Sequence, residues 1–292
     1  MLKLIHQRRA NGMKRVLTIQ DISCVGKCST SVALPVISVL GSETVILPTA
    51  LLSAHSQFEG FTFKDLTDQI GPITRHWKDM GIKFDAIYTG YLGTEEQIDM
   101  VKGIIADFRD DDTLVFVDPV MADFGVLYTG FDKAYADKNL ELCSSADIIV
   151  PNVTEASIMT GVEYREEQDR DEAYIRALLS GLADLGANIN VITGVSLEPG
   201  KTGIMGVDSV TGEEYVYQTA VIDTDEELHG TGDLFASICV GEMMRGRSWQ
   251  EAMKRACDYT ARTIEITVAD PERRWYGVDF EAMLPELIQD IR

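Results

Sequence analysis

Short runs of β-branched and other apolar residues alternate with amphipathic segments along most of this chain. The runs predict strands at 15–20, 43–47, 84–88, 114–118, 147–150 and 190–193. Apolar residues at helical spacing predict helices at 62–80, 95–108, 171–185, 234–245 and 249–268. Because this alternation is typical of parallel sheets covered by helices, we expect an α/β fold that binds ligands at the carboxyl ends of its strands.

Two regions depart from that alternation. The runs at 203–208 and 214–218, joined around Thr211 and Gly212, predict an antiparallel hairpin at the sheet edge. The charge run at 166–172 predicts the solvated start of a helix.

The chain shows no linker and no internal repeat, so we expect one domain over residues 13–292. Residues 1–12 carry several basic residues and no acid, but they lack the apolar core and cleavage site of a signal peptide. A strand-like run begins directly after Met13. We therefore expect 1–12 to be a disordered extension or the product of an upstream start codon.

Composition narrows the classes of function. The net charge of −21 over 292 residues argues against nucleic-acid binding, because phosphate contacts need clustered Lys and Arg. The longest apolar run, 32–40, includes Pro35 and is too short to cross a membrane. The five cysteines are odd in number and scattered, and neither they nor the histidines have zinc-ligand spacing. We expect reduced thiols and a cytoplasmic protein.

The most informative motif is Gly230-Thr231-Gly232-Asp233, which precedes an apolar run at 234–240. Glycines permit a tight turn, and the start of a helix offers unpaired amides and partial positive charge to a phosphate group. Asp233 could then accept a proton from an attacking hydroxyl. The alternative is that the glycines only make a turn and Asp233 only complements the helix dipole.

Several predicted strands end in polar residues that are able to bind ligands. Each could simply cap a helix, and Asn152 with Glu155 has the spacing of a capping box. Together they indicate one crevice in which Asp118 and Glu155 could hold Mg²⁺ beside a nucleotide, which favours a kinase. These strand-end residues are Asp21, Ser23, Asp118, Asn152, Glu155, Thr193 and Gly194.

The segment GVSLEPGKT at 194–202 is close to a P-loop but does not fit one. It has five residues between Gly194 and Gly200 where the pattern requires four, and a strand-like run follows it instead of a helix. Lys201 is therefore expected on a loop near the nucleotide or in solvent.

The residues from Arg15 to about Leu287 resemble the pyridoxal kinases of the ribokinase-like superfamily. The Gly-Thr-Gly-Asp motif indicates only the superfamily, whereas YTGYLG and VDPVMAD narrow the resemblance to these kinases. The matching segments are LTIQDISCVGKCS (17–29), LPTALLSAHS (47–56), YTGYLG (88–93), VDPVMAD (117–123), IVPNVTEA (149–156), VITGV (191–195) and HGTGDLFAS (229–237).

This resemblance implies a mostly parallel sheet with helices on both faces, a homodimer, and ATP-dependent phosphorylation of the 5′-hydroxymethyl group of pyridoxal, pyridoxine or pyridoxamine. It implies that Asp233 is the base and that the amides of Gly230, Thr231 and Gly232 form the anion hole. The residues implied to bind the vitamer are Asp21, Ser23, His55, Ser56 and Tyr91.

The resemblance also implies positions for the nucleotide and its ions. Asp118, Asn152 and Glu155 match positions near ATP and Mg²⁺, and Gly194 is expected beside the nucleotide. Asp123 and Thr193 match positions linked with K⁺ or the phosphates, so the implied metal set is Asp118, Asp123 and Glu155.

Two departures keep alternatives open. Many relatives have a serine directly after the first-strand glutamine, where this chain has Asp21, and many have a threonine where this chain has Val150. The aspartate at position 21 bears on which ring the protein prefers as substrate. Val150 has no side-chain oxygen, so only the backbone could ligate a cation at that position. The alternatives are a hydroxymethylpyrimidine kinase of thiamine synthesis and a ligand-binding sensor without catalysis, which would bind without turnover.

Overall fold

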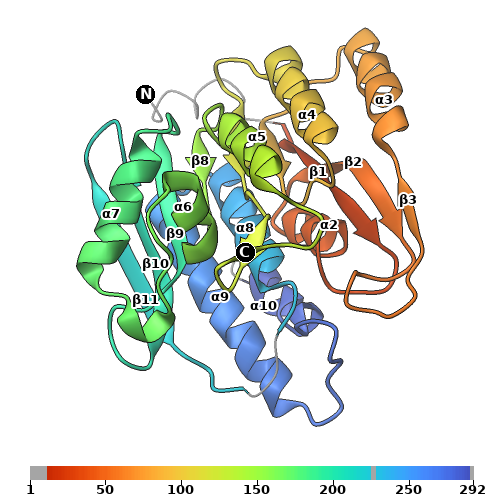
Figure 1. Ribbon diagram of the computed structural model, residues 1–292. Coiled ribbons are helices and arrows are strands. Elements are labelled where there is room, and N and C mark those ends of the chain that lie inside the picture. The colour runs from red at the N-terminus through yellow and green to blue at the C-terminus, as the bar shows by residue number, and fades with distance from the viewer. Residues whose placement is uncertain (1–11, 225–227, 290–292) are drawn as a thin grey trace.

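The computed structural model describes residues 12–224 and 228–289 and contains a nine-stranded sheet (Figure 1). Six parallel strands form its centre: β1 (Arg15–Ser23), β2 (Glu43–Leu52), β4 (Ala86–Thr89), β5 (Leu114–Val117), β8 (Ile148–Ile149) and β9 (Ile189–Val195). The strand order is β11-β10-β9-β8-β5-β4-β1-β2-β3. The predicted α/β fold is confirmed.

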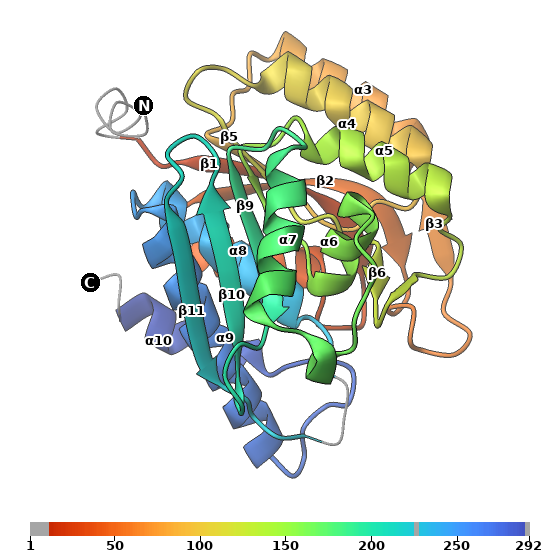
Figure 2. The ribbon, with the colours of Figure 1, turned by 60° about the vertical axis from the view of Figure 1, so that its left-hand side comes forward.

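Antiparallel strands close both edges of the sheet. At one edge β10 (Lys201–Asp208) and β11 (Glu214–Ala220) form the predicted hairpin, and at the other β3 (Phe63–Asp65) pairs with the end of β2 (Figure 2). A separate two-stranded ribbon, β6 (Ala122–Asp123) with β7 (Val126–Leu127), follows β5.

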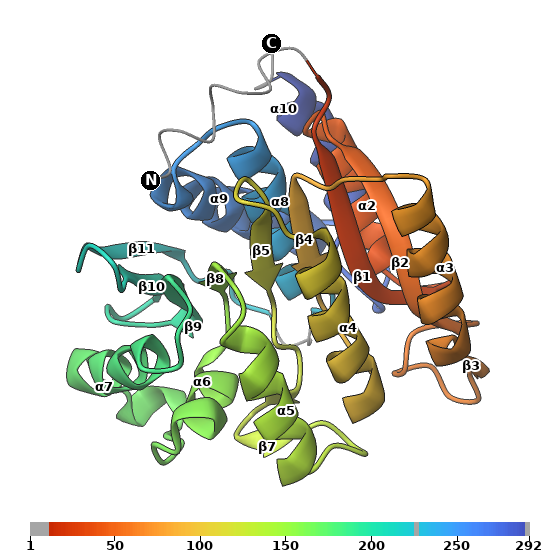
Figure 3. The ribbon, with the colours of Figure 1, turned by 90° about the horizontal axis from the view of Figure 1, so that it is seen from above.

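Helices cover both faces of the sheet, as the view from above shows (Figure 3). One layer contains α3 (Thr67–Asp79), α4 (Glu95–Phe108), α5 (Lys133–Cys143), α6 (Val153–Thr160) and α7 (Glu172–Ala183). The opposite layer contains α2 (Thr30–Val39), α8 (Thr231–Met244), α9 (Trp249–Ala269) and α10 (Leu284–Gln289). Short 3₁₀ turns lie at Glu167–Asp169 and Phe280–Ala282.

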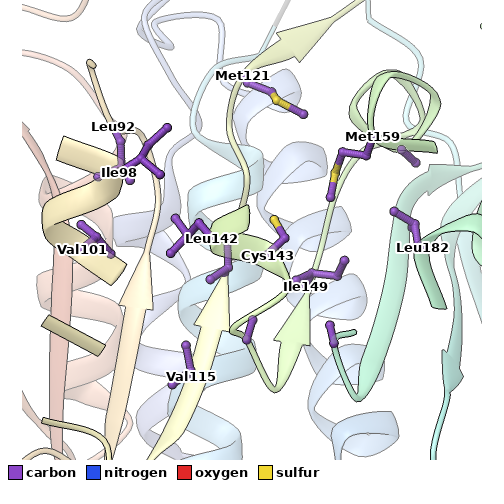
Figure 4. Packing of buried hydrophobic residues seen from close by; sticks show 14 of the residues in the cluster. Leu92, Ile98, Val101, Val115, Met121, Leu142, Cys143, Ile149, Met159 and Leu182 are labelled. Carbon is purple, nitrogen blue, oxygen red and sulfur yellow. The ribbon is translucent and has the colours of Figure 1, made fainter. Parts of the chain in front are cut away.

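Each face of the sheet has its own hydrophobic core. Figure 4 shows part of the first core, where Val115 and Ile149 of the strands pack with Leu142 and Leu182 of the covering helices. The second core surrounds α8, whose residues 234–243 are all buried. A helix that is apolar on every side is buried in the core, where contacts with the surrounding elements fix its position. The start of α8 is therefore fixed against the sheet.

Several predicted boundaries were wrong. The expected helix at 62–80 begins only at Thr67, because residues 63–65 pair with 50–52 of β2. β1 continues past residue 20 to Ser23 and β2 past residue 47 to Leu52, because the ends of the two strands pair after a register shift. In the charge run at 166–172, a 3₁₀ turn precedes α7, which begins at Glu172 after the N-cap Asp171.

Helices α2, α5, α6 and α10 were not predicted as helices. Most of the expected N-terminal extension, residues 1–11, lies outside the described residues. Within the described ranges, no helix has both the length and the apolar character needed to cross a membrane.

Candidate active site

Asp233 lies in the first turn of α8, where its half-buried carboxylate accepts a hydrogen bond from the backbone amide of Ser29. Burial raises the pKa of Asp233 to about 7; the Ser29 amide opposes this rise, and the nearby Asp21 carboxylate adds to it. A carboxylate that titrates near neutral pH is suited to accept a proton from an alcohol.

The turn before Asp233 needs glycine at one position. Gly230 caps α8 in the left-handed conformation, with φ of 83°. A Cβ on Gly230 would lie 1.8 Å from the carbonyl oxygen of Lys27, whereas a Cβ on Gly232 would meet nothing within 4 Å. The turn therefore packs tightly on the loop after β1 and leaves the start of α8 open to an anion.

Ser29 links Asp233 to Asp21 and was missed by the sequence analysis. Its backbone is strained, with φ of 51° and ψ of −133°. This conformation directs its amide to Asp233, and its hydroxyl donates a hydrogen bond to Asp21. A serine at positive φ gives no sequence signal, because spacing and composition do not report backbone strain.

The end of β1 contributes a second buried carboxylate. The hydroxyl of Ser23 donates to Asp21 at 3.1 Å, and burial raises the pKa of Asp21 despite the Ser29 and Ser23 hydrogen bonds. Burial raises the pKa of Tyr91, and the negative charge of the nearby Asp21 raises it further. The structure thus brings Asp21, Ser23 and Tyr91 to the same side as Asp233.

His55 lies in an aromatic cluster that we define as His55, Phe58, His229, Trp275 and Tyr276. The His55 ring centroid is 4.9 Å from that of Phe58, 5.3 Å from that of His229 and 5.9 Å from that of Trp275. Burial and then the neighbouring His229 lower the pKa of His55. The cluster joins the loop after β2 to the residue before Gly230.

The residues in and beside the aromatic cluster differ in two ways from the set expected to bind the vitamer. Ser56 is exposed, and no hydrogen bond in the described part of the chain involves its side chain. Trp275 and Tyr276 come from the segment after α9, about 220 residues from His55, so no local pattern could have indicated them.

Asp118 and Glu155 form an acidic pair whose charges interact, and Asp118 also lies close enough to Asp233 to interact with its charge. Burial, the charge of Glu155 and then that of Asp233 raise the pKa of Asp118 well above its usual value. Glu155 completes a capping box with Asn152 at the start of α6, and it accepts from the backbone amides of Asn152 and Met121 at 2.8 and 2.9 Å. Burial raises the pKa of Glu155 to about 7.

The acidic pair fits a divalent cation, since a bound cation would relieve the repulsion that raises the pKa of Asp118. The oxygens of Glu155 already accept from two backbone amides, so direct ligation would fall to Asp118, with phosphate and water oxygens completing the shell. Among the described residues, no three His, Cys, Asp or Glu side chains form a ready-made metal cage. The metal role of Asp123 stays a prediction.

A cavity of about 340 Å³ lies beside this pair. It is lined by four predicted nucleotide or ion residues, Asp123, Asn152, Thr193 and Gly194. Asn152 and Thr193 are neighbours through a parallel bridge, and the Asn152 amide group donates to the carbonyl of Ala122 at 2.9 Å. The ends of β8 and β9 and the β6–β7 ribbon therefore enclose one volume. Another cavity, of about 390 Å³ between α3 and α4, contains none of the predicted site residues.

The P-loop-like segment does not form a phosphate loop. Lys201 begins β10 and pairs with Glu198 at 2.6 Å on the surface, and it does not line the cavity beside Asn152.

A mostly parallel sheet between two helical layers, with a Gly-Thr-Gly-Asp helix start facing an acidic pair at its strand ends, defines the class of ribokinase-like kinases. The family model described as phosphomethylpyrimidine kinase matches residues 68–274, and the chain belongs to this family.

Three relatives illustrate the breadth of the family. A Bacteroides thetaiotaomicron protein, provisionally named a phosphomethylpyrimidine kinase, is 34% identical with a TM-score of 0.89, covering 96% of both chains, and a second crystal form of it contains pyridoxal. The pyridoxal kinase of Lactobacillus plantarum is 28% identical with a TM-score of 0.86, covering 95% of this chain and 98% of that one. The pyridoxal kinase of Dictyostelium discoideum is 25% identical over 79% of this chain and 78% of its own length.

Proposed function

We propose that this protein transfers the γ-phosphate of ATP to the 5′-hydroxymethyl group of pyridoxal, pyridoxine or pyridoxamine. The observation that carries the proposal is the place of Asp233, a carboxylate with a pKa of about 7 in the first turn of a helix whose amides face the same site. A related protein that is 34% identical has been crystallised with pyridoxal, which supports a B6 vitamer as the substrate.

The chemistry follows from these groups. The Asp233 carboxylate accepts the proton of the substrate hydroxyl as its oxygen attacks the γ-phosphorus, and the bond from that phosphorus to the β,γ-bridging oxygen breaks to release ADP. The amides at the start of α8 stabilise charge on the transferred phosphoryl group. Asp118, with Glu155 behind it, would hold Mg²⁺, which neutralises charge on the phosphates when bound.

Two further parts of the site support nucleotide and ring binding. We assign Asn152, Thr193 and Gly194 to the nucleotide because they line one cavity, and Asp123 and Thr193 to the phosphates or a K⁺ ion. The vitamer ring is assigned to the space bounded by Asp21, Ser23, Tyr91 and the aromatic cluster around His55, with Ser56 at its exposed edge. Aromatic walls with few polar groups suit a flat pyridine ring.

A hydroxymethylpyrimidine substrate is the second candidate, since the matching family model is described as phosphomethylpyrimidine kinase, which acts on a related pyrimidine. Asp21 favours the pyridine, because a buried carboxylate can pair with a protonated ring nitrogen and pyridine is more basic than pyrimidine.

The molecular setting is proposed on separate grounds. We expect a cytoplasmic protein because all five cysteines are free. The family resemblance supports a homodimer. The continuous nine-stranded sheet supports a single domain over residues 13–292. Light scattering that gave a monomer mass, or two separate unfolding transitions, would contradict these two expectations.

The test is a coupled ADP-release assay with purified protein, Mg²⁺ and K⁺, comparing pyridoxal, pyridoxine, pyridoxamine and hydroxymethylpyrimidine. Turnover with the B6 vitamers that is lost in Asp233→Asn supports the proposal. Turnover with the pyrimidine alone would assign the protein to thiamine synthesis. Vitamer binding without turnover would favour the sensor.

A further inference from the structure

The charge balance of the 340 Å³ cavity beside Asn152 is unfavourable for a nucleotide. Its lining includes the carboxylates of Asp123, Glu166 and Glu167, and Arg170 is the one cation among the described residues that line it. A polyphosphate entering this volume would meet net negative charge unless cations compensate it. Arg170 is thus the side chain of this wall that can attract the phosphates.

Arg170 is held in a fixed orientation. Its Nε donates to the carbonyl of Arg165 at 2.8 Å and its Nη2 donates to the Tyr164 hydroxyl at 2.9 Å. The guanidinium also lies over the Tyr164 ring, 5.2 Å from its centroid. Tyr164 packs against Gly125 of the β6–β7 turn, where a Cβ would come within 2.8 Å of the ring. Arg170 is therefore held by two residues of its own segment, and one of them, Tyr164, packs in turn on the β6–β7 turn.

No carboxylate of the described residues neutralises this guanidinium. Across the ranges that the structure describes, Arg170 forms no salt bridge, although Glu166 and Glu167 are close in sequence. Its two hydrogen bonds go to neutral oxygens and leave Nη1 without a partner in the described chain. A preorganised, unpaired guanidinium on a cavity wall is suited to bind an oxyanion, because Arg offers several donors in a rigid plane.

We infer that Arg170 binds the phosphate chain of the nucleotide, with Tyr164 as the platform that holds it. This inference rests on the proposed ATP-dependent function and adds to it a binding residue from the segment between α6 and α7. Arg170 acts on nucleotide affinity and makes no contact with the proton-accepting carboxylate of Asp233.

The same segment supplies a matched control. Arg165 also stacks on a tyrosine, with its guanidinium 4.8 Å from the Tyr174 centroid, but it does not line the cavity and lies 3.9 Å from the carboxylate of Asp171. Replacing Arg165 removes the same charge and a similar stacking contact from the same surface. Any long-range effect of net charge should therefore be equal in the two variants.

The experiment is calorimetric titration of the full chain with a non-hydrolysable ATP analogue and with adenosine, in the presence of Mg²⁺ and without a vitamer. We expect Arg170→Gln to weaken binding of the analogue by about 10- to 100-fold and to flatten its salt dependence, since a charge-assisted hydrogen bond is lost. Adenosine affinity should not change. Arg165→Gln should change neither affinity by more than about twofold.

Several outcomes would overturn the inference. Arg170→Gln with the affinity of the parent protein for the analogue would do so, as would an equal loss for adenosine, which would indicate a collapsed loop. Arg170→Lys provides a second test. If Arg170 binds the phosphates, the retained charge should restore part of the affinity for the analogue that Arg170→Gln loses. If Arg170 is only structural, Arg170→Lys should restore none of it. A parent protein that binds no analogue would defeat both this inference and the proposed function, whereas analogue binding without vitamer turnover would defeat the proposed function alone.

Discussion

The backbone amide of Ser29 donates a hydrogen bond to the carboxylate of Asp233, and the Ser29 side chain donates to Asp21. One residue at the start of α2 therefore contacts both carboxylates. The contact requires a backbone conformation with φ of 51° that non-glycine residues rarely adopt. The backbone strain at Ser29 thus accompanies the hydrogen bond that orients the Asp233 carboxylate.

Ser29 provides a test of that strain. Ser29→Gly keeps the amide and removes the steric cost of positive φ, whereas Ser29→Ala keeps the cost. We expect the glycine variant to exceed the alanine variant in free energy of unfolding by about 1 kcal/mol, as measured by urea denaturation. An alanine variant at least as stable as the glycine variant would mean that the backbone at Ser29 is not strained.

The pH dependence of the reaction should report Asp233. The base works as a carboxylate, and its pKa is raised to about 7, so protonation should remove activity as the pH falls below that value. We expect kcat/KM for the vitamer to be level above about pH 8 and to fall about tenfold per unit below pH 6. A profile that stays level down to pH 5 would show that no group of this kind limits the reaction.

The two glycines of the Gly-Thr-Gly-Asp turn should differ in their tolerance of alanine. Gly230→Ala places a Cβ against the carbonyl oxygen of Lys27 and imposes positive φ on alanine, so we expect a loss of about 3 kcal/mol in unfolding free energy. Gly232→Ala has open space within a helix and should be neutral or stabilising by up to about 1 kcal/mol. Urea denaturation of both variants gives the comparison, and equal stability of the two would contradict the packing of Gly230 on Lys27.

The buried Glu242 should be essential for the packing of α8 on α9. Its fully buried carboxylate accepts from Arg247 and Arg255 at 2.7 Å each and from Arg245 at 3.0 Å. Glu242→Gln removes the charge that these guanidiniums share, so we expect a loss of about 3 kcal/mol or more in thermal or urea unfolding. Glu265→Gln, which breaks a half-exposed pair on α9, should cost less than about 1 kcal/mol. Similar losses in the two variants would refute the structural role of Glu242.

The sequence predicted those elements whose signals are local. Helix α4 was placed at its observed bounds, 95–108, because its apolar spacing is regular and Thr94 caps it. β3 was missed because three residues pair with a strand that lies more than ten positions earlier. The helix α2 lies in an apolar run with Pro35 inside it, which gives no helical periodicity.

The residues of the candidate site likewise fall into those that have a sequence signal and those that have none. Asp118, Asn152 and Thr193 were predicted to lie together because parallel strands bring their carboxyl ends to one edge of the sheet. Asp233 was predicted from the Gly-Thr-Gly-Asp motif that precedes an apolar run. Ser29 acts through its backbone conformation, and Trp275 joins His55 from the far end of the chain. Such residues depend on tertiary packing, which no spacing in the sequence encodes.

The proposed role of Asp233 as the base is tested by comparing Asp233→Asn with the parent protein. The measurements are kcat with pyridoxal and the affinity for a non-hydrolysable ATP analogue. The variant keeps the shape of the side chain and removes its ability to accept a proton. We expect kcat to fall by about 10²- to 10⁴-fold while the affinity for the analogue changes less than about threefold. An unchanged kcat, or a loss of affinity as large as the loss of kcat, would contradict the role of Asp233 as the base.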